Sequence, residues 1–199
     1  DWGLAAKFHD VTGNGLPDLW VANDYWTPDR FWINEGNGVF REGSWKQIRN
    51  QASSAMSVAY SDINRDGHVD IFVGDMLSRS YSRRKRQMGA MVPTPMIVGV
   101  IEDQPQFMRN VLYVNRGDGT FAEIAQMAGV DKSDWTWASL FLDVDLDGYE
   151  DLLVTNGHAH DVQDTDTTRR LSEMRDKLSL EEWKRKLIEY PPLETENFA

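Results

Sequence analysis

The sequence predicts an all-β protein built from four-stranded antiparallel sheets of the kind that form β-propeller blades, with a helical insertion near the C-terminus. Three observations support this fold class: an acidic nine-residue loop that occurs three times, a turn motif that occurs twice, and a common spacing between them. A repeat of four strands at a period of about 50 residues is typical of propeller blades. A chain of 199 residues holds about three such blades, so we expect a partial propeller.

The acidic loops begin at Asp10, Asp62 and Asp143, and each has oxygen-bearing side chains at loop positions 1, 3, 5 and 9 and glycine at position 6. A hard cation such as Ca²⁺ requires six to eight oxygen ligands, which alternate residues of a tightly curled loop can supply, and glycine permits the sharp turn. The sequence therefore predicts up to three calcium sites. Their side-chain ligands would be Asp10, Thr12, Asn14 and Asp18; Asp62, Asn64, Asp66 and Asp70; and Asp143, Asp145, Asp147 and Asp151.

The segments around the loops indicate strands. An EF-hand would place a glutamate at position 12 and continue as a helix, whereas position 12 here is Val21, Val73 or Val154. The runs 19–22, 71–74 and 152–155 that follow the loops, and 2–8, 55–60 and 137–142 that precede them, are short and apolar. Such runs favour buried strands. The repeating unit is therefore strand, loop, strand, which disfavours an EF-hand or a dockerin.

The turn motif N-x-G-x-G-x-F occupies 34–40 and 115–121, each time after an apolar segment (30–33 and 110–114). Asn-Gly and Asp-Gly predict tight hairpins, because both central residues adopt positive φ. The acidic loops are 52 and 81 residues apart, and the loop-to-turn distances of 24 and 53 residues also differ by 29. One insertion at about 77–107 explains both differences. We therefore expect one partial propeller over 1–199, with blade 1 at about 2–42, blade 2 at about 54–125, and blade 3 from about 137 with a helical insertion at 157–195.

The chain resembles the FG-GAP/VCBS-repeat family of calcium-binding β-propellers, which includes the integrin-α-like repeats. Segments 2–6, 112–121 and 154–158 are most similar to the bacterial branch associated with ASPIC/UnbV domains. The resemblance covers about 2–76 and 107–158, but the Phe-Gly and Gly-Ala-Pro tags are replaced by the residues at 21–24 and 73–76. This departure weakens any analogy with integrin ligand binding. The resemblance also implies that backbone carbonyls at loop position 7, from Leu16, His68 and Tyr149, complete the calcium shells.

Composition and charge restrict the partners. The net charge of −11 opposes nucleic-acid binding, and three Ca²⁺ ions would leave the protein at about −5. No apolar run is long enough to span a bilayer, and the absence of cysteine excludes disulfides and thiolate metal sites. The chain begins within a strand-like repeat, so we read it as part of a larger propeller that is completed by remaining blades or, as the alternative, by neighbouring chains. We expect an extracellular, periplasmic or cell-surface location.

Connections on the face opposite the acidic loops are the expected recognition surface, because loops on a rigid scaffold commonly carry binding residues. The candidate ligand-binding residues are Tyr25, Trp26, Arg83, Arg84, His158 and His160. Each has a structural alternative: the insertions can cap the propeller, the basic run at 79–86 can be a solvated helix face, and the histidines can form local hydrogen bonds rather than hold a transition metal. Helices are expected at about 167–178, after Thr165 or Asp166, and after the capping box Ser179–Glu182; core packing is the default for their apolar side chains.

Three functions remain open from the sequence. The first is a non-catalytic, calcium-stabilised module for adhesion or for recognition of a protein or glycan. The second is the propeller part of a secreted polysaccharide-active enzyme, and the third is a structural subunit of an extracellular fibre or surface array. No nucleophile elbow, phosphate-binding loop or zinc-protease motif occurs in the sequence, and the first function is therefore preferred.

Overall fold

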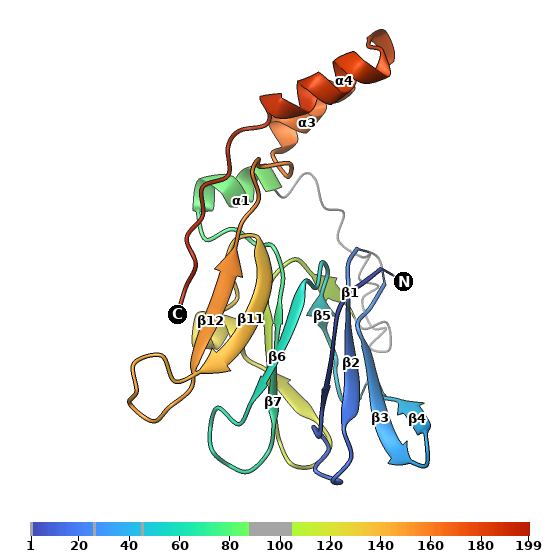
Figure 1. Ribbon diagram of the computed structural model, residues 1–199, viewed down its shortest axis with the longest axis vertical. Helices are drawn as coiled ribbons and strands as arrows, with labels where there is room; N and C mark the ends of the chain where they lie inside the picture. Colours follow the sequence, from blue (N-terminus) through green and yellow to red (C-terminus); the bar gives the residue numbers. More distant parts are fainter. Residues whose placement is uncertain (1, 26, 45, 88–104) are drawn as a thin grey trace.

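Antiparallel sheets stand side by side, with helices at one end (Figure 1). The computed structural model describes residues 2–25, 27–44, 46–87 and 105–199. Trp26 and the apolar stretch 88–101 of the first insertion therefore lie outside the described residues. The three acidic loops project from the end of the sheets opposite the helices, as the strand topology predicts.

The first sheet has the strand order β1-β2-β3-β4, in which every neighbouring pair is antiparallel. Its strands follow the chain in order, so each strand returns beside its predecessor. The expected strand and turn segments are confirmed, although β1 begins and ends one residue later than expected. The strands are β1 (Gly3–His9), β2 (Asp18–Asn23), β3 (Arg30–Gly36) and β4 (Val39–Glu42).

The second sheet repeats this design with the order β6-β7-β9-β10. The first insertion separates β7 from β9, yet these two strands still pair directly, with Phe72 opposite Leu112. The strands are β6 (Ser57–Ser61), β7 (Asp70–Gly74), β9 (Val111–Asn115) and β10 (Phe121–Glu123). A short parallel pair, β5 (Gln51–Ala52) and β8 (Gln106–Phe107), joins the connection between the sheets to the end of the insertion.

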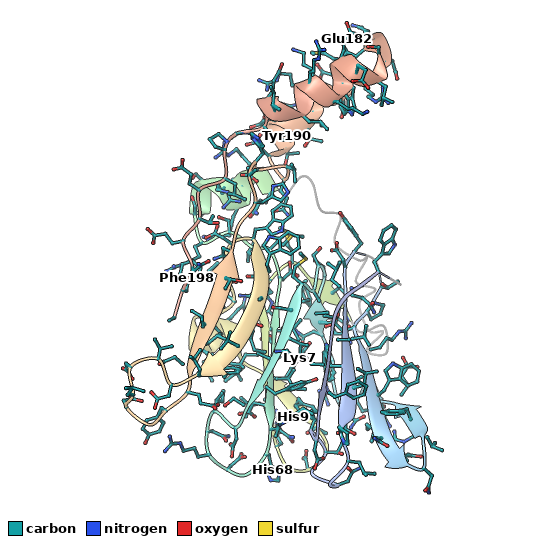
Figure 2. The ribbon with its side chains drawn as sticks, in the orientation of Figure 1. Lys7, His9, His68, Glu182, Tyr190 and Phe198 are labelled. Carbon is teal, nitrogen blue, oxygen red and sulfur yellow. The ribbon has the colours of Figure 1, made fainter. Side chains whose placement is uncertain are left out.

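The third sheet consists of β11 (Thr136–Leu142) and β12 (Asp151–Asn156), which pair through the register Leu140 opposite Leu153. A third strand begins beside β12, where Val154 and Phe198 exchange both backbone hydrogen bonds at 2.8 and 2.9 Å. Figure 2 shows Phe198 alongside this strand. The described residues therefore contain two complete four-stranded sheets and the beginning of a third, and no closed propeller.

Apolar side chains hold the sheets together. One cluster lies between the first two sheets and includes Trp20, Phe31, Val73 and Tyr113, all at most 6% exposed. A second cluster joins the second and third sheets and includes Phe72, Leu112 and Val154. Alternation along the strands produces this arrangement, since successive side chains point to opposite faces and each sheet can contact two neighbours.

The insertions form helices at the end opposite the acidic loops. They contain α1 (Tyr81–Gln87), α3 (Thr165–Ser172), η1 (Arg175–Lys177), α4 (Leu180–Lys186) and η2 (Leu187–Glu189), whereas α2 (Ala125–Ala128) follows β10. The expected helix at 167–178 starts earlier, because the Asp164 side chain accepts the N–H of Thr167 as the N-cap, and it ends at Ser172. The capping box of Ser179 and Glu182 is confirmed.

The arm formed by α3 and α4 projects from the sheets (Figures 1 and 2), with Glu182 near its tip and Tyr190 at its base. The expectation that apolar side chains of this region pack into a core is wrong for α4, which has no buried residue. Leu187 and Ile188 are 41% and 71% exposed. A helix this far from the sheets contacts too few side chains to bury its apolar face. Among the described residues, no helix is long and apolar enough to cross a membrane.

Candidate metal centres

The three acidic loops share one hydrogen-bond pattern, which begins with the aspartate at position 1. Its two carboxylate oxygens accept the N–H groups of positions 5 and 6, at 3.0 and 2.8 Å for Asp10, 3.0 and 2.8 Å for Asp62, and 3.0 and 2.9 Å for Asp143. Each loop is thereby wrapped around its first carboxylate. Because every carboxylate oxygen has two lone pairs, these bonds leave acceptor capacity for a cation.

Backbone angles explain the glycine at position 6 and reveal a second requirement at position 4. Gly15, Gly67 and Gly148 have φ of 82°, 86° and 88°. Position 4 is also left-handed, with φ of 72° at Gly13, 58° at Arg65 and 63° at Leu146. Two loops therefore hold a non-glycine residue in a region that costs about 1 kcal/mol or more. The sequence pattern had indicated only position 6.

In the first two loops the aspartate at position 9 links the loop to its sheet. Oδ2 of Asp18 and of Asp70 accepts loop N–H groups at 2.9–3.1 Å. Oδ1 of the same residues accepts the N–H of Asn34 and of Asn115, both at 2.8 Å. These asparagines open the N-x-G-x-G-x-F turns, so the two sequence motifs form one connected unit. Sequence analysis used the asparagines only as turn markers and missed this role.

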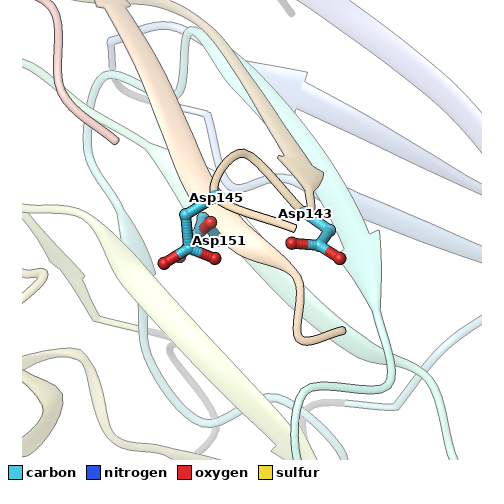
Figure 3. A group of neighbouring side chains, drawn as sticks. All are labelled: Asp143, Asp145 and Asp151. Carbon is cyan, nitrogen blue, oxygen red and sulfur yellow. The ribbon is translucent and has the colours of Figure 1, made fainter. Parts of the chain in front are cut away.

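The third loop brings three carboxylates together. Asp143, Asp145 and Asp151 each offer an oxygen, and these oxygens lie within 4.8 Å of one another (Figure 3). Two oxygens that bind one Ca²⁺ at 2.3–2.6 Å can be separated by at most about 5 Å, so this group fits a calcium ion. Within the described ranges no other three acidic, histidine or cysteine side chains converge in this way. Asp147 lies outside the group, and its Oδ1 accepts the N–H of Tyr149 at 2.7 Å.

Electrostatics distinguish two aspartates of the second loop. Hydrogen bonding, chiefly from the backbone N–H of His68, holds the pKa of Asp66 below its usual value. Burial raises the pKa of Asp70, and the neighbouring carboxylates of Asp66 and Asp62 raise it further. A divalent cation in this loop would offset the repulsion from Asp66 and Asp62, which opposes ionisation of Asp70.

The second and third loops contact each other through Arg65. Its guanidinium lies 3.8 Å from the ring centroid of Tyr149 and donates a hydrogen bond to the carbonyl oxygen of Gly148. The hydroxyl of Ser61 also donates to Glu150 beside this contact. Tyr149 occupies position 7, where the family resemblance implies a carbonyl ligand. These contacts couple the position of the second loop to that of the third.

The residues predicted for recognition do not form one site. Tyr25 is 53% exposed and has φ of 59°. Arg83 is largely buried, and its guanidinium forms ion pairs with Asp134 at 2.7 Å and Asp161 at 2.9 Å. Arg84 donates to the carbonyls of Ser78 and Arg79. Arg83 therefore joins the first insertion to the segment before β11 and to the second insertion, whereas Arg84 stabilises the first insertion itself.

Both histidines of the predicted pair contact backbone oxygens. Nδ1 of His158 lies 2.6 Å from the carbonyl oxygen of His160, and the ring stacks on Trp135 with centroids 4.5 Å apart. Nδ1 of His160 lies 2.9 Å from the carbonyl oxygen of Tyr190. These contacts are the local hydrogen bonds that were the alternative to a transition-metal site.

A third repeated contact, which sequence analysis did not find, marks the start of each third strand. Oδ1 of Asp29, Asn110 and Asn197 accepts the N–H of the residue five positions after the loop's last aspartate, at 2.9, 2.7 and 2.8 Å. The chemical signal is weak, because one member is an aspartate and two are asparagines. The contact at Asn197 shows that the final residues begin a third strand in the same way as in the first two sheets.

Comparison with protein families gives a match to the FG-GAP-like repeat at residues 10–73 and 97–154, which together exceed half of the chain. The matched ranges contain all three acidic loops and both turn motifs. A comparison with curated proteins found no match. On the strength of the repeat match, the chain belongs to the family of proteins with FG-GAP-like repeats.

Proposed function

We propose that this chain is a calcium-stabilised, extracellular β-propeller module that recognises a protein or glycan and does not catalyse a reaction. The observation that carries the proposal is the convergence of three carboxylate oxygens in the third loop on a backbone pattern shared by all three loops. Asp143, Asp145 and Asp151 would hold the first ion, and the corresponding residues of the other loops would hold up to two more.

Calcium would act here as a structural ligand. Without it, neighbouring carboxylates of a loop repel one another. Burial is the main cause of the raised pKa of Asp70, and Asp66 and Asp62 raise that pKa further. A bound cation removes this repulsion and connects residues at both ends of the turn. Because the folded loop binds the ion and the unfolded chain does not, the free energy of unfolding increases with calcium concentration.

The open face of the first sheet supports further propeller blades as partners. Six of its side chains have equivalents in the second sheet that pack into the cluster between the sheets. The pairs, at the repeat spacings of 52 and 81 residues, are Ala6 and Val58, Phe8 and Tyr60, Leu19 and Ile71, Val21 and Val73, Trp32 and Tyr113, and Phe40 and Phe121. Phe8 is 61% exposed and Phe40 39%. We therefore propose that another blade of the same repeat covers this face.

A structural subunit of a fibre or array is the second candidate, and the open face of the third sheet favours it. Leu140 and Leu142 are 38% and 37% exposed on that face, and by the repeat spacing they lie on the side equivalent to Trp20 of the first sheet. The open face of the first sheet and the open face of the third sheet are thus equivalent to the two faces that pack against each other between neighbouring sheets. Sedimentation at increasing concentration tests this candidate: head-to-tail oligomers would support it, and a monomer at all concentrations would contradict it.

Thermal unfolding in EGTA, in Ca²⁺ and in Mg²⁺ tests the main proposal. We expect a rise in Tm with Ca²⁺ that Mg²⁺ does not reproduce, because Mg²⁺ demands a smaller octahedral shell. The matched variant Asp143→Asn should lose part of the rise, whereas Asp176→Asn, outside the loops, should keep all of it. A folded protein with the same Tm in EGTA and Ca²⁺ would refute the proposal.

A further inference from the structure

A groove of about 320 Å³ lies between the connection that joins the first two sheets and the outer strands of the second sheet. Three arginines, Arg49, Arg109 and Arg116, line it together with Asn50, Phe121 and Glu123. This concentration of positive charge is unexpected in a chain of net charge −11. The groove contains none of the loop aspartates.

Among the described residues that line the groove, the one acidic side chain is already engaged. Oε2 of Glu123 pairs with Nη2 of Arg109 at 2.7 Å, and Oε1 accepts the N–H of Ala125 at 2.7 Å. The other terminal nitrogen of Arg109, Nη1, is buried and has no hydrogen-bond partner among the described residues. A buried guanidinium N–H without an acceptor is costly, so this atom favours an anionic or polar ligand.

Two further guanidinium groups add to this charge. Arg49 and Arg116 are exposed, and no ion pair joins either of them to an acidic group in the described residues. Nearby Asp118 has a lowered pKa, chiefly because Thr120 donates hydrogen bonds to it and to a smaller extent because of Arg116. The lining therefore carries three positive charges against the single paired carboxylate of Glu123.

Hydrogen bonds between the two walls hold the groove in shape. The Tyr113 hydroxyl donates to the carbonyl oxygen of Asn50 at 2.8 Å, and the N–H of Phe121 donates to the carbonyl oxygen of Gln47 at 3.2 Å. Tyr113 is 1% exposed and packs in the core. A site that is rigid before binding loses less entropy when a ligand enters.

We propose that this groove binds a carboxylate or sulfate group carried on a body about the size of one sugar residue. Its volume lies at the lower end of the range of about 300–1,000 Å³ for small-molecule sites, and arginine matches planar or tetrahedral oxyanions through paired N–H donors. The inference deepens the proposed recognition function and rests on it, since it names an acidic glycan as the ligand class. Arg109 would contact the anion from the buried side, and Arg49 and Arg116 from the open side.

Titration of the intact chain with sodium glucuronate, sodium sulfate and neutral glucose, followed by NMR, tests the proposal. We expect glucuronate or sulfate, but not glucose, to shift resonances at the groove, and binding to weaken as salt increases. Glucuronate binding alone would identify carboxylated sugars, and sulfate binding alone would identify sulfated ones. Equal binding of glucose, or no binding of either anion by folded protein, would overturn the proposal.

Variants locate the binding. Arg116→Gln and Arg49→Gln should each weaken anion binding by about tenfold, which corresponds to the loss of one charge-assisted hydrogen bond. Arg185→Gln, on α4, removes the same charge from a distant position and should leave binding unchanged; an equal loss in this control would overturn the site.

Repeating the titration in EGTA and in Ca²⁺ separates the two proposals. If anions do not bind but Ca²⁺ still raises Tm, only this inference is rejected. If anions bind but Ca²⁺ does not raise Tm, only the calcium role is rejected.

Discussion

Replacement of Asp70 by alanine should destabilise the protein even without calcium. Asp70 is fully buried, and its carboxylate accepts the N–H of Asn115 at 2.8 Å and that of Ile63 at 3.0 Å. Each buried N–H left without a partner costs about 1–3 kcal/mol. Part of this cost is offset because the variant no longer buries a carboxylate whose pKa burial has raised. We therefore expect Asp70→Ala to lower the free energy of unfolding by about 2–4 kcal/mol.

The equivalent aspartate of the third sheet provides the control. Asp151 accepts one exposed N–H in the described structure, from Val144 at 3.0 Å, and water can replace that bond. Asp151→Ala should therefore cost less than about 1 kcal/mol in EGTA. Urea unfolding of both variants in EGTA, followed by circular dichroism, measures the difference. Equal losses would refute the role assigned to the link between the acidic loop and β9, and Asp70→Asn, which retains one acceptor, should fall between wild type and alanine.

Three other predictions concern the loops and the buried carboxylates. Asp143→Ala and Asp147→Ala should reduce the calcium-dependent rise in Tm more than Asp10→Ala, because the third loop has four aspartates and the first has two; equal reductions in thermal melts would contradict this ranking. Leu146→Gly should raise the free energy of unfolding by about 0.5–1 kcal/mol in urea titrations, because Leu146 is 85% exposed with φ of 63°, and Leu146→Ala should not. Burial raises the pKa of Asp29 to about 7, so the stability that its protonated form contributes is complete below the unfolded pKa of 3.8 and is lost as pH rises toward 7. Asp29→Asn should therefore flatten the decline in the free energy of unfolding between these pH values. An unchanged pH profile of stability in EGTA would exclude Asp29 as the cause of the decline.

The strand-loop-strand units could be predicted because their signals are local. Glycine at position 6 and the apolar segments on both sides depend only on neighbouring residues, and the structure forms β1 with β2, β6 with β7 and β11 with β12 at these places. The asparagine turns were predicted for the same reason. They differ in detail: Asn37 has φ of 53° before Gly38, whereas Asp118 is not left-handed and accepts the N–H and hydroxyl of Thr120 instead.

Functional side chains outside the loops were less predictable. The basic run at 79–86 was a candidate contact surface, yet Arg83 lies between Asp134 and Asp161, which are 51 and 78 residues away in the chain. Its partners come from the segment before β11 and from the second insertion. No local pattern indicates such a pairing, because it depends on how two separate connections meet above the sheets.

The acidic loops and the candidate ligands within each loop could be read from the sequence, because each loop spans only nine residues, and the repeat could be read from the recurrence of these loops along the chain. Three sets of neighbours became visible only in the folded protein: Asp70 with Asn115, Arg65 with Tyr149, and Arg49 with Arg109 and Arg116. Asp70 and Asn115, Arg65 and Tyr149, and Arg49 and the other two arginines are separated by 45 to 84 positions, and strand pairing and packing between sheets bring them together. The alternation of apolar residues predicts which face of a strand is buried, whereas the packing of the sheets determines which residues that face contacts.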